Sequence, residues 1–367
     1  MKIVLTGGGT GGHAYPAISI AEALRALPNG APDCELLYLG SRDSLEARLA
    51  ASAGIPFVGL TGRKLRKVLS PGSILTAAAL AAGFVQALRE LRRFKPDLVI
   101  GTGGYASAAV VLAQALRRGK TLIHEQNMVP GRTNLWLSRF ATRICVTFED
   151  SIKYFPSGKT FVTGLPVRSE LLSLPAKEKA RAALGLEPGT FTILVLGGSQ
   201  GAQRLNEVVA ESVPDLSRLP VQLLHQTGQR NHDEAARRRE SVGWDRYHLR
   251  AYFDDMRPVY AAADLVVSRC GASTVAEITA VGLPAILVPY PYAYADHQRL
   301  NGEFLADKDA AIVVTDADLS AERLTSAVRR LVESPAELKK MADASRGLGK
   351  PGAARDIAMI AVEMVNA

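Results

Sequence analysis

The stretch from Ser268 to Glu277, SRCGASTVAE, combines residue types that can bind a phosphate group without a metal ion. A short apolar run precedes it, and Gly271 permits a tight turn before a helix that Ser273 or Thr274 would cap. The start of a helix presents unpaired backbone N–H groups and about half a positive charge, which attract anions. Glu277, one turn further along, could accept hydrogen bonds from a ribose diol. We therefore expect a nucleotide-binding turn here, although an ordinary capped helix gives the same pattern.

A histidine stands at the start of another glycine-rich helix. The run GGGTGGH, from Gly7 to His13, follows an apolar strand and contains the dinucleotide-binding pattern GxGxxG. Ser41 and Arg42 follow the second strand and would suit NADP, so an oxidoreductase stays open at this point. A pyrophosphate loop gains nothing from an imidazole, whereas a general base is often a histidine. The sequence therefore favours His13 as a base over a histidine that merely helps to cap the helix.

Further glycine loops and polar clusters follow other strands. TGGYAS (102–107), HEQN (124–127) and LGGSQGA (196–202) each adjoin an apolar run, and DHQ (296–298) comes shortly after a later strand. Open α/β sheets bind ligands at the carboxyl ends of their parallel strands, and HEQN places four polar side chains there. His124 and Glu125 therefore stay alternative candidates for the base.

Apolar runs alternate with helical segments along the chain. About seven strand candidates lie between residues 2 and 163, and the order strand, glycine loop, helix begins again at Thr192. This alternation predicts an α/β protein with two Rossmann-like, doubly wound parallel-sheet lobes that face a central cleft. We place the lobes at residues 1–163 and 164–346, separated by GLPVR (164–168). The final helix, within 347–367, has one apolar face and is expected to pack back on the first lobe.

The basic residues are unevenly distributed. The formal net charge is +8, and the segment from Arg63 to Lys95 contains eight basic residues and one acid, Glu90. Its uncharged apolar part, Ile74 to Val85, is shorter than the roughly 20 residues that span a bilayer. We expect a helix over about 71–93 that rests on an anionic membrane surface, with a core helix that has solvated basic ends as the alternative. No nucleic-acid partner is expected, because aromatic residues are not interleaved with the basic ones.

Length and cysteine usage limit the class of protein. A chain of 367 residues suits two domains of roughly 150–200 residues each. The three cysteines are far apart and form no CxxC pair, which favours a reducing compartment over a disulfide framework or a structural zinc site. The first residues lead straight into a strand without a signal-peptide core, so we expect a cytoplasmic protein.

Together, these motifs resemble those of the MurG family. GGGTGGH, GTGGY, HEQN, TGLPVR, LGGSQGA, SRCGASTVAE and DHQ occur in the family's order and approximate spacing over essentially the whole chain. Members transfer N-acetylglucosamine (GlcNAc) from UDP-GlcNAc to undecaprenyl-pyrophosphoryl-MurNAc-pentapeptide (lipid I) in peptidoglycan synthesis, which serves cell-wall biogenesis, cell shape and cell division. The resemblance implies a glycosyltransferase B fold, with the acceptor on the first lobe and the donor mainly on the second. It also implies a peripheral protein on the cytoplasmic face of the cell membrane and an inverting reaction without a cofactor.

The resemblance extends to individual residues. His13, Asn127 and Glu125 are its candidate catalytic residues. Substrate contacts are implied for Thr10, Gly11, Gly12, Asn127, Arg168, Ser199, Phe253, Ala272, Ser273, Thr274, Glu277 and Gln298. Arg168 and Ser199 would meet the diphosphate, the Phe253 backbone would meet the uracil, and Gln298 would meet the GlcNAc hydroxyls. With no metal predicted, helix N-termini, glycine-loop amides and Arg168 would have to stabilise the leaving UDP.

Some residues depart from the family pattern, and some alternatives stay open. Cys270 stands where serine is commoner, Ala108 and Ala109 replace a usual Gly-Pro, and RKLR (63–66) fits the acceptor loop poorly. Asp316-Ala317-Asp318 matches the DxD motif of metal-dependent glycosyltransferases, but turn and capping roles explain both acids. A UDP-GlcNAc epimerase or hydrolase of the same fold is the first alternative. An NADP-dependent oxidoreductase, which leaves LGGSQGA and SRCGASTVAE unexplained, and a non-catalytic partner subunit are the others.

Overall fold

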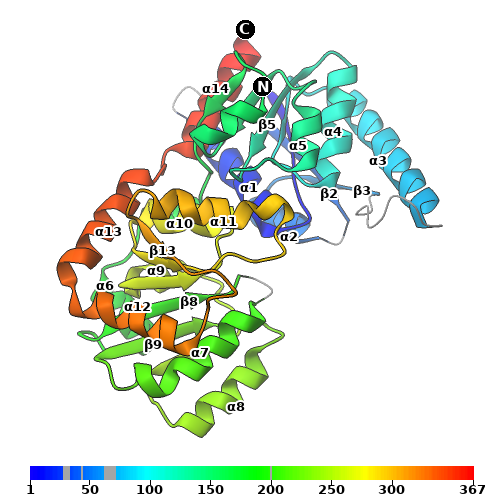
Figure 1. Ribbon diagram of the computed structural model, residues 1–367. Helices are drawn as coiled ribbons and strands as arrows, with labels where there is room; N and C mark the ends of the chain where they lie inside the picture. The colour runs from blue at the N-terminus through cyan, green and yellow to red at the C-terminus, as the bar shows by residue number, and fades with distance from the viewer. Residues whose placement is uncertain (28–33, 43, 62–71, 199–200) are drawn as a thin grey trace. The chain divides into compact units, whose positions relative to one another are not determined.

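The chain folds into two compact units. The computed structural model describes residues 1–27, 34–42, 44–61, 72–198 and 201–367 (Figure 1). Unit 1 comprises Met1–Arg168 and Lys350–Ala367, and unit 2 comprises Ser169–Gly349. The GLPVR segment thus lies in unit 1, whereas the sequence suggested a boundary before it. A hydrogen bond contributes to this placement of GLPVR: the Gly164 carbonyl lies 2.9 Å from the Nε2 atom of His124, which is buried in unit 1.

Unit 1 is a parallel sheet with helices on both faces. Its elements are β1 (Lys2–Thr6), α1 (Gly11–Ala26), β2 (Glu35–Ser41), α2 (Leu45–Ser52), β3 (Phe57–Leu60), α3 (Gly72–Phe94), β4 (Leu98–Gly101), α4 (Tyr105–Leu116), β5 (Lys120–Glu125), α5 (Arg132–Leu137), β6 (Arg143–Val146), the 3-10 helix η1 (Glu149–Tyr154), β7 (Thr160–Val162) and α14 (Ala353–Asn366). The described strands pair in parallel in the order β3-β2-β1-β4-β5-β6-β7. Two buried clusters cover the two faces, and the chain's last helix, α14, packs on α1 in one of them (Figure 1).

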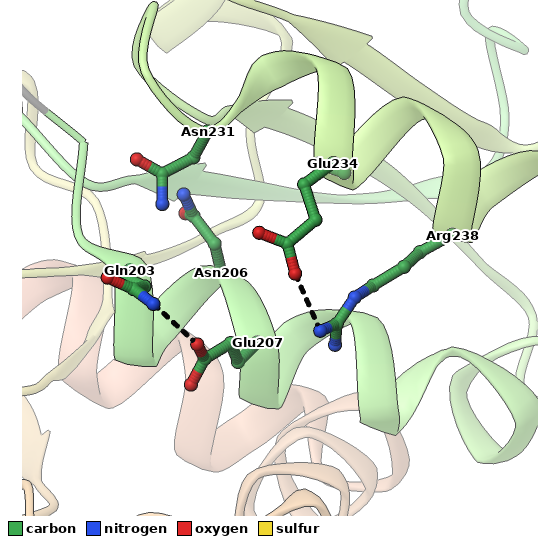
Figure 2. A pocket seen from close by; sticks show the side chains of 7 residues that line it. Gln203, Asn206, Glu207, Asn231, Glu234 and Arg238 are labelled. Atoms are coloured by element: carbon green, nitrogen blue, oxygen red, sulfur yellow. Dashed lines mark hydrogen bonds and ion pairs between the residues drawn. The ribbon is translucent and has the colours of Figure 1, made fainter.

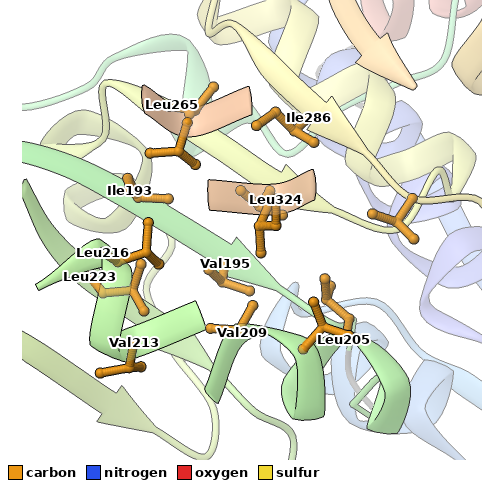
Figure 3. Close-up of a cluster of buried hydrophobic side chains, with 14 of the residues drawn as sticks. Ile193, Val195, Leu205, Val209, Val213, Leu216, Leu223, Leu265, Ile286 and Leu324 are labelled. Atoms are coloured by element: carbon orange, nitrogen blue, oxygen red, sulfur yellow. The ribbon is translucent and has the colours of Figure 1, made fainter. Parts of the chain in front are cut away.

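Unit 2 repeats this architecture. Its elements are the 3-10 helix η2 (Ser169–Leu172), α6 (Lys177–Leu184), β8 (Phe191–Leu196), α7 (Gln203–Leu216), β9 (Val221–Gln226), α8 (His232–Val242), β10 (Tyr247–Arg250), α9 (Arg257–Ala262), β11 (Leu265–Ser268), α10 (Ala272–Val281), β12 (Ala285–Leu287), the 3-10 turn η3 (Tyr294–Asp296), α11 (His297–Ala306), β13 (Ala311–Val313), α12 (Ala321–Glu333) and α13 (Pro335–Leu348). The described strands pair in parallel in the order β10-β9-β8-β11-β12-β13. Figure 3 shows one buried cluster, where aliphatic side chains of β8 meet those of α7. Strands buried on both faces have to be apolar throughout, which explains their continuous hydrophobic runs. The predicted doubly wound α/β fold is confirmed for each unit.

The strand order places the glycine loops at one point of each sheet. In unit 1 the order reverses between β1 and β4, where Thr6 pairs with Gly101, and the loops GGGTGGH and TGGYAS follow these two strands. In unit 2 it reverses between β8 and β11, where Leu196 pairs with Ser268, and LGGSQGA and SRCGASTVAE continue from them. Ligands of open α/β sheets bind at this reversal, outside the carboxyl ends of the strands. The motifs recognised in the sequence therefore lie at the expected ligand-binding edge of each unit.

The basic segment is described only in part. The predicted helix over about 71–93 is present as α3 (Gly72–Phe94), whereas residues 62–71, with Arg63 and Arg66 among them, lie outside the described residues. Within the part of the chain that the structure describes, no helix has the length and hydropathy needed to traverse a bilayer.

The lowered pKa values of two fully buried histidines predict how the free energy of unfolding depends on pH. His225 on β9 lies 2.9 Å from the Tyr247 hydroxyl and 3.0 Å from Asn206 Oδ1, and burial lowers its pKa to about 3. Burial likewise lowers the pKa of His124 to about 4. In the unfolded chain both return to about 6.5, so between these pH limits the unfolded state binds more protons. The contribution of these two neutral histidines to the free energy of unfolding is therefore fully present above pH 6.5. It is lost as the pH falls toward their folded-state pKa values.

We predict that the free energy of unfolding decreases from pH 7 to pH 5, by up to about 1.4 kcal/mol per pH unit for each histidine that titrates fully. Denaturant titrations of the wild type and of His225→Gln at pH 8, 7, 6 and 5 test this. The variant starts from lower stability at pH 8 but has a shallower slope, because one titrating group is gone. Parallel slopes for the two proteins would contradict the prediction.

Candidate active site

Two glycine loops of unit 1 enclose His13. The loops are joined by a 3.3 Å hydrogen bond from Gly8 N–H to the Gly103 carbonyl. A Cβ atom at position 104 would lie only 2.2 Å from the Gly8 oxygen, so only glycine permits this approach. Thr102 Oγ1 donates to the His13 carbonyl at 2.7 Å and ties the first turn of α1 to the end of β4. These contacts fix the backbone of His13 between the two loops.

Hydrogen bonding determines which nitrogen of His13 is available. Nδ1 lies 3.2 Å from the Gly8 carbonyl oxygen and 3.2 Å from Thr10 Oγ1. Because a carbonyl oxygen only accepts, Nδ1 carries the hydrogen in the neutral ring and Nε2 keeps its lone pair. Burial lowers the pKa of His13, while the Gly8 hydrogen bond and the charge of Glu46 raise it. The net direction is downward from 6.5, so the ring is neutral at pH 7 and Nε2 can accept a proton.

Glu125, predicted as catalytic, is buried beneath the loop that carries Asn127. It is 1% exposed, and burial raises its pKa while the hydrogen bonds that it accepts oppose that rise. Its Oε1 accepts from the Asn127 backbone N–H at 3.0 Å and lies 3.4 Å from Asn127 Nδ2. Its Oε2 accepts from Gly131 N–H at 3.1 Å and from Asn134 Nδ2 at 2.9 Å. These contacts position half-buried Asn127 and leave the carboxylate no surface on which to meet a substrate.

His124, the other alternative base, is also buried. Its Nε2 donates to the Gly164 carbonyl, and Gln126 Nε2 lies 3.2 Å from its Nδ1. Gln126 Nε2 also donates to the Thr102 carbonyl at 2.6 Å, which connects the HEQN motif to the second glycine loop. Of the three candidate bases, only His13 combines partial exposure with an available nitrogen.

Unit 1 also carries the other first-loop candidates and Arg168. The Arg168 guanidinium lies 5.2 Å from the ring centroid of Tyr15, on the first turns of α1. The same ring lies in contact range of Gly11, since a Cβ there would be 3.3 Å from Tyr15 Cε2. Thr10 is exposed, and Gly11 and Gly12 are half-buried. Arg168 thus lies beside the first turns of α1, and its predicted contact with the diphosphate stays a prediction.

In unit 2, α10 begins without a side-chain cap. We expected Ser273 or Thr274 to cap this helix, but the N-cap residue is Gly271, and no side chain there accepts a hydrogen bond from the helix. The Ser273 hydroxyl oxygen is buried and has no hydrogen-bond partner among the described residues. A helix start without a cap keeps its N–H groups for a ligand, which fits anion binding better than the capped form that we expected. Gly282 ends α10 in the left-handed conformation, with φ of 72°.

Glu277, Phe253 and Gln298 each form a hydrogen bond within unit 2. Glu277 Oε2 accepts from the hydroxyl of buried Tyr260 at 2.8 Å. Phe253 donates its backbone N–H to Gln226 Oε1 at 3.1 Å, so its carbonyl is the backbone group left for a nucleobase. Gln298 Oε1 accepts from the Tyr290 N–H at 3.0 Å, which leaves the amide NH₂ to donate. Ser199 lies outside the described residues.

Other polar groups near these loops are engaged within the protein. In the pocket between α7 and α8, Gln203 donates to Glu207 and Arg238 donates to Glu234 (Figure 2). In the DxD sequence, Asp316 pairs with Arg269, and Asp318 accepts from Thr315 Oγ1 at 2.6 Å. Among the described residues, no group of three His, Cys, Asp or Glu side chains could hold a metal ion. Cys270 is buried, and its Sγ lies against Gly302.

Comparison with known proteins agrees with the geometry of both units. Residues 3–146 match the N-terminal domain, and residues 192–357 the C-terminal domain, of glycosyltransferase family 28. A relative from Desulforudis audaxviator, named UDP-N-acetylglucosamine--N-acetylmuramyl-(pentapeptide) pyrophosphoryl-undecaprenol N-acetylglucosamine transferase, is 42% identical over 96% of this chain and 95% of its own. The crystal structure of Acinetobacter baumannii MurG matches with a TM-score of 0.77 and 28% identity, covering 99% of both chains. The chain belongs to the MurG family.

Membership of the MurG family also establishes that the chain is a glycosyltransferase with the glycosyltransferase B fold. A UDP-GlcNAc 2-epimerase from Neisseria meningitidis, solved with UDP-GlcNAc, matches with a TM-score of 0.71 over 99% of this chain and all of its own. At 15% identity this likeness shows the fold alone.

The MurG motifs identified candidate residues on both units but not Glu46 or Tyr38, which contact the first glycine loop. An acid in the first turn of a helix is too common to single out Glu46.

A substitution at Gly103 tests whether the two glycine loops fix the position of the His13 ring. A Cβ atom at position 103 would lie 2.8 Å from His13 Cδ2 and 3.1 Å from Nε2. We predict that Gly103→Ala lowers turnover about 100-fold or more, because the displaced imidazole no longer meets the acceptor. The control is Gly158→Ala, whose φ is also positive (81° against 101°) but whose Cβ would meet nothing within 4 Å. The control should lose about 1 kcal/mol of stability and keep its activity. Equal activity of the two variants would contradict the enclosure.

Proposed function

We propose that this chain transfers GlcNAc from UDP-GlcNAc to the 4-hydroxyl of the MurNAc residue of lipid I, giving lipid II with inversion at the anomeric carbon. The observation that carries the proposal is the 42% identity, over nearly the full length of both chains, to a relative named for this reaction. Two features of the chain support it: a histidine with an available ring nitrogen in unit 1 and an uncapped helix start in unit 2.

The reaction is a direct displacement assisted by a base. The 4-hydroxyl oxygen attacks C1 of GlcNAc while its proton moves to His13 Nε2. The bond between C1 and the diphosphate oxygen breaks, and its electron pair leaves with UDP. Attack from the face opposite UDP converts the α-linked donor into a β-linked product. A positioned base contributes about 10²–10⁴-fold to such a rate.

The negative charge that develops on UDP needs compensation. We assign this to the N–H groups and the Ser273 hydroxyl at the start of α10, together with Ala272, Thr274 and Arg168. Arg168 is held beside Tyr15, and Ser199 is assigned to the diphosphate by family resemblance alone. Preorganised donors of this kind stabilise the transition state without reorientation during the reaction.

Other contacts orient the two substrates. In unit 2, Glu277, held by Tyr260, would accept from the ribose hydroxyls, Phe253 would contact the uracil through its carbonyl, and the Gln298 amide would donate to the sugar. In unit 1, Asn127 would donate to the transferred sugar, and the backbone of Thr10, Gly11 and Gly12 would line the reaction site. Glu125 is assigned to positioning Asn127 rather than to proton transfer.

The proposed acceptor is a lipid, so the enzyme has to contact the membrane that contains it. On α3, the side chains of Arg89, Arg92 and Arg93 are exposed, as is Val85 at 63% of its surface. We propose that this helix rests on the anionic cytoplasmic face of the cell membrane, with each nearby arginine contributing about 1 kcal/mol.

A vesicle assay tests the membrane contact. Replacing Arg89, Arg92 and Arg93 together with glutamine should weaken binding to vesicles with 30% anionic lipid at least about tenfold. The control replaces three exposed arginines of unit 2 with glutamine, namely Arg218, Arg237 and Arg329. Equal loss in both triple variants would mean that net charge, rather than α3, governs attachment.

The alternative function is an epimerase or hydrolase, which shares the fold and acts on UDP-GlcNAc without a lipid acceptor. Radiolabelled UDP-GlcNAc, incubated with and without lipid I, distinguishes the two, followed by analysis of the product linkage. Transfer that depends on lipid I and gives a β linkage supports the proposal. Rapid release of UDP, or formation of an epimer without acceptor, supports the alternative.

The role of His13 gives a separate prediction. His13→Ala should lower kcat by about 10²–10⁴-fold, since the hydroxyl loses its proton acceptor. UDP-GlcNAc binding, measured by calorimetry, should change little because the assigned donor contacts of unit 2 are intact. Comparable loss of turnover and of donor affinity would reassign His13 to donor binding.

A further inference from the structure

A buried carboxylate lies against the first glycine loop. Glu46, on the first turn of α2, is 1% exposed, although acids are rarely buried unless they are paired. Its Oε1 accepts from the Ser41 backbone N–H at 3.2 Å, and among the described residues no lysine or arginine forms an ion pair with it. Its side chain therefore lies inside unit 1, against the first glycine loop, rather than in solvent.

Two glycines provide the space that this carboxylate occupies. A Cβ atom at Gly8 would lie 2.1 Å from Glu46 Oε1, and one at Gly40 would lie 2.9 Å from Glu46 Cγ. Gly8 is also the residue whose carbonyl accepts the hydrogen of His13 Nδ1. Glu46 therefore contacts the same residue that fixes the tautomer of the base.

The other ionisable and charged groups around His13 do not substitute for Glu46. Tyr38 on β2 donates its hydroxyl to the Gly7 carbonyl at 2.6 Å, and burial, with a contribution from the charge of Glu46, raises its pKa. His124 on β5 is neutral at pH 7, since burial lowers its pKa to about 4. Arg168 is held over the Tyr15 ring, and its side chain is a cation, so it cannot compensate a positive charge on His13. Glu46 is thus the group in this surrounding whose charge favours an imidazolium.

We propose that Glu46 is a positioning residue for the general base: it supports Gly8 from behind and stabilises the positive charge that His13 acquires when Nε2 takes the acceptor's proton. This inference rests on the proposed transferase function. During the step the proton moves from the sugar hydroxyl to Nε2, and Glu46 exchanges no proton. In a buried site, a fixed negative charge stabilises a developing positive charge more strongly than it would in water.

Glu46→Gln tests the charge separately from the shape. Glutamine keeps the volume and can still accept from Ser41 N–H, so a purely structural role would leave the variant like the wild type. We expect kcat at pH 7.5 to fall about tenfold with the KM for UDP-GlcNAc unchanged. Removal of the charge lowers the pKa of His13, so the acid limb of the kcat–pH profile moves to lower pH. Glu46→Asp, which keeps the charge, should retain the wild-type position of that limb.

The matched control is Glu35→Gln, which removes the same charge from an exposed residue at the start of β2 in the same unit. It should leave both kcat and the pH profile unchanged. An unchanged profile in Glu46→Gln, or an equal shift in Glu35→Gln, would overturn the inference.

An NMR titration separates this inference from the proposed function. The ¹⁵N signals of the His13 ring, assigned by comparison with His13→Gln, report its pKa and tautomer without any turnover. A lower His13 pKa in Glu46→Gln supports the coupling even if the wild type fails to transfer GlcNAc, in which case the proposed function alone fails. A wild type that transfers GlcNAc, together with a His13 pKa that is the same in wild type and variant, overturns the role of Glu46.

Discussion

The hydrogen bond between His13 Nδ1 and the Gly8 carbonyl is the contact on which the unit 1 site depends. It fixes the tautomer, and therefore which nitrogen can accept a proton. The Gly8 carbonyl is in turn placed by the hydrogen bond between the two glycine loops, which exist side by side because β1 and β4 are neighbours in the sheet. Residues that are nearly a hundred positions apart in the sequence thus form one site through the strand order alone.

In unit 2, the feature suited to binding a negative charge is the start of a helix. Its central strands also end in glycine-containing turns, but α10 begins at Gly271 with no side-chain cap, and the Ser273 hydroxyl lacks a partner among the described residues. An unsatisfied helix start is unfavourable in the free protein and favourable once an anion arrives. In the proposed reaction, unit 1 would provide the base and unit 2 the anion-binding amides, so the two similar folds would divide acid–base chemistry from charge stabilisation.

The sequence was sufficient for the features that depend on local pattern. The buried strands were visible as continuous apolar runs, and the glycine loops as clusters after them. The role of His13 as a base stays a prediction. The sequence was misleading where tertiary contacts decide. Serine is a residue type that often caps helices, yet Gly271 rather than Ser273 is the N-cap of α10. GLPVR resembles a linker, yet a hydrogen bond from His124 holds it within unit 1. Burial of Glu125 could not be foreseen either, because its hydrogen-bond donors come from the following turn and from α5.

The buried acids explain why shape and electrostatics are inseparable here. Glu125 is compensated by donors from Asn127, Gly131 and Asn134, so its charge mainly organises a loop. Glu46 accepts from Ser41 N–H, so more of its field is left to act on its surroundings. Gly8 and Gly40 lack side chains where Glu46 lies, and a methyl group at either position would collide with it. The absence of side chains in the first glycine loop therefore leaves room for a buried carboxylate next to Gly8, the residue whose carbonyl bonds to His13 Nδ1.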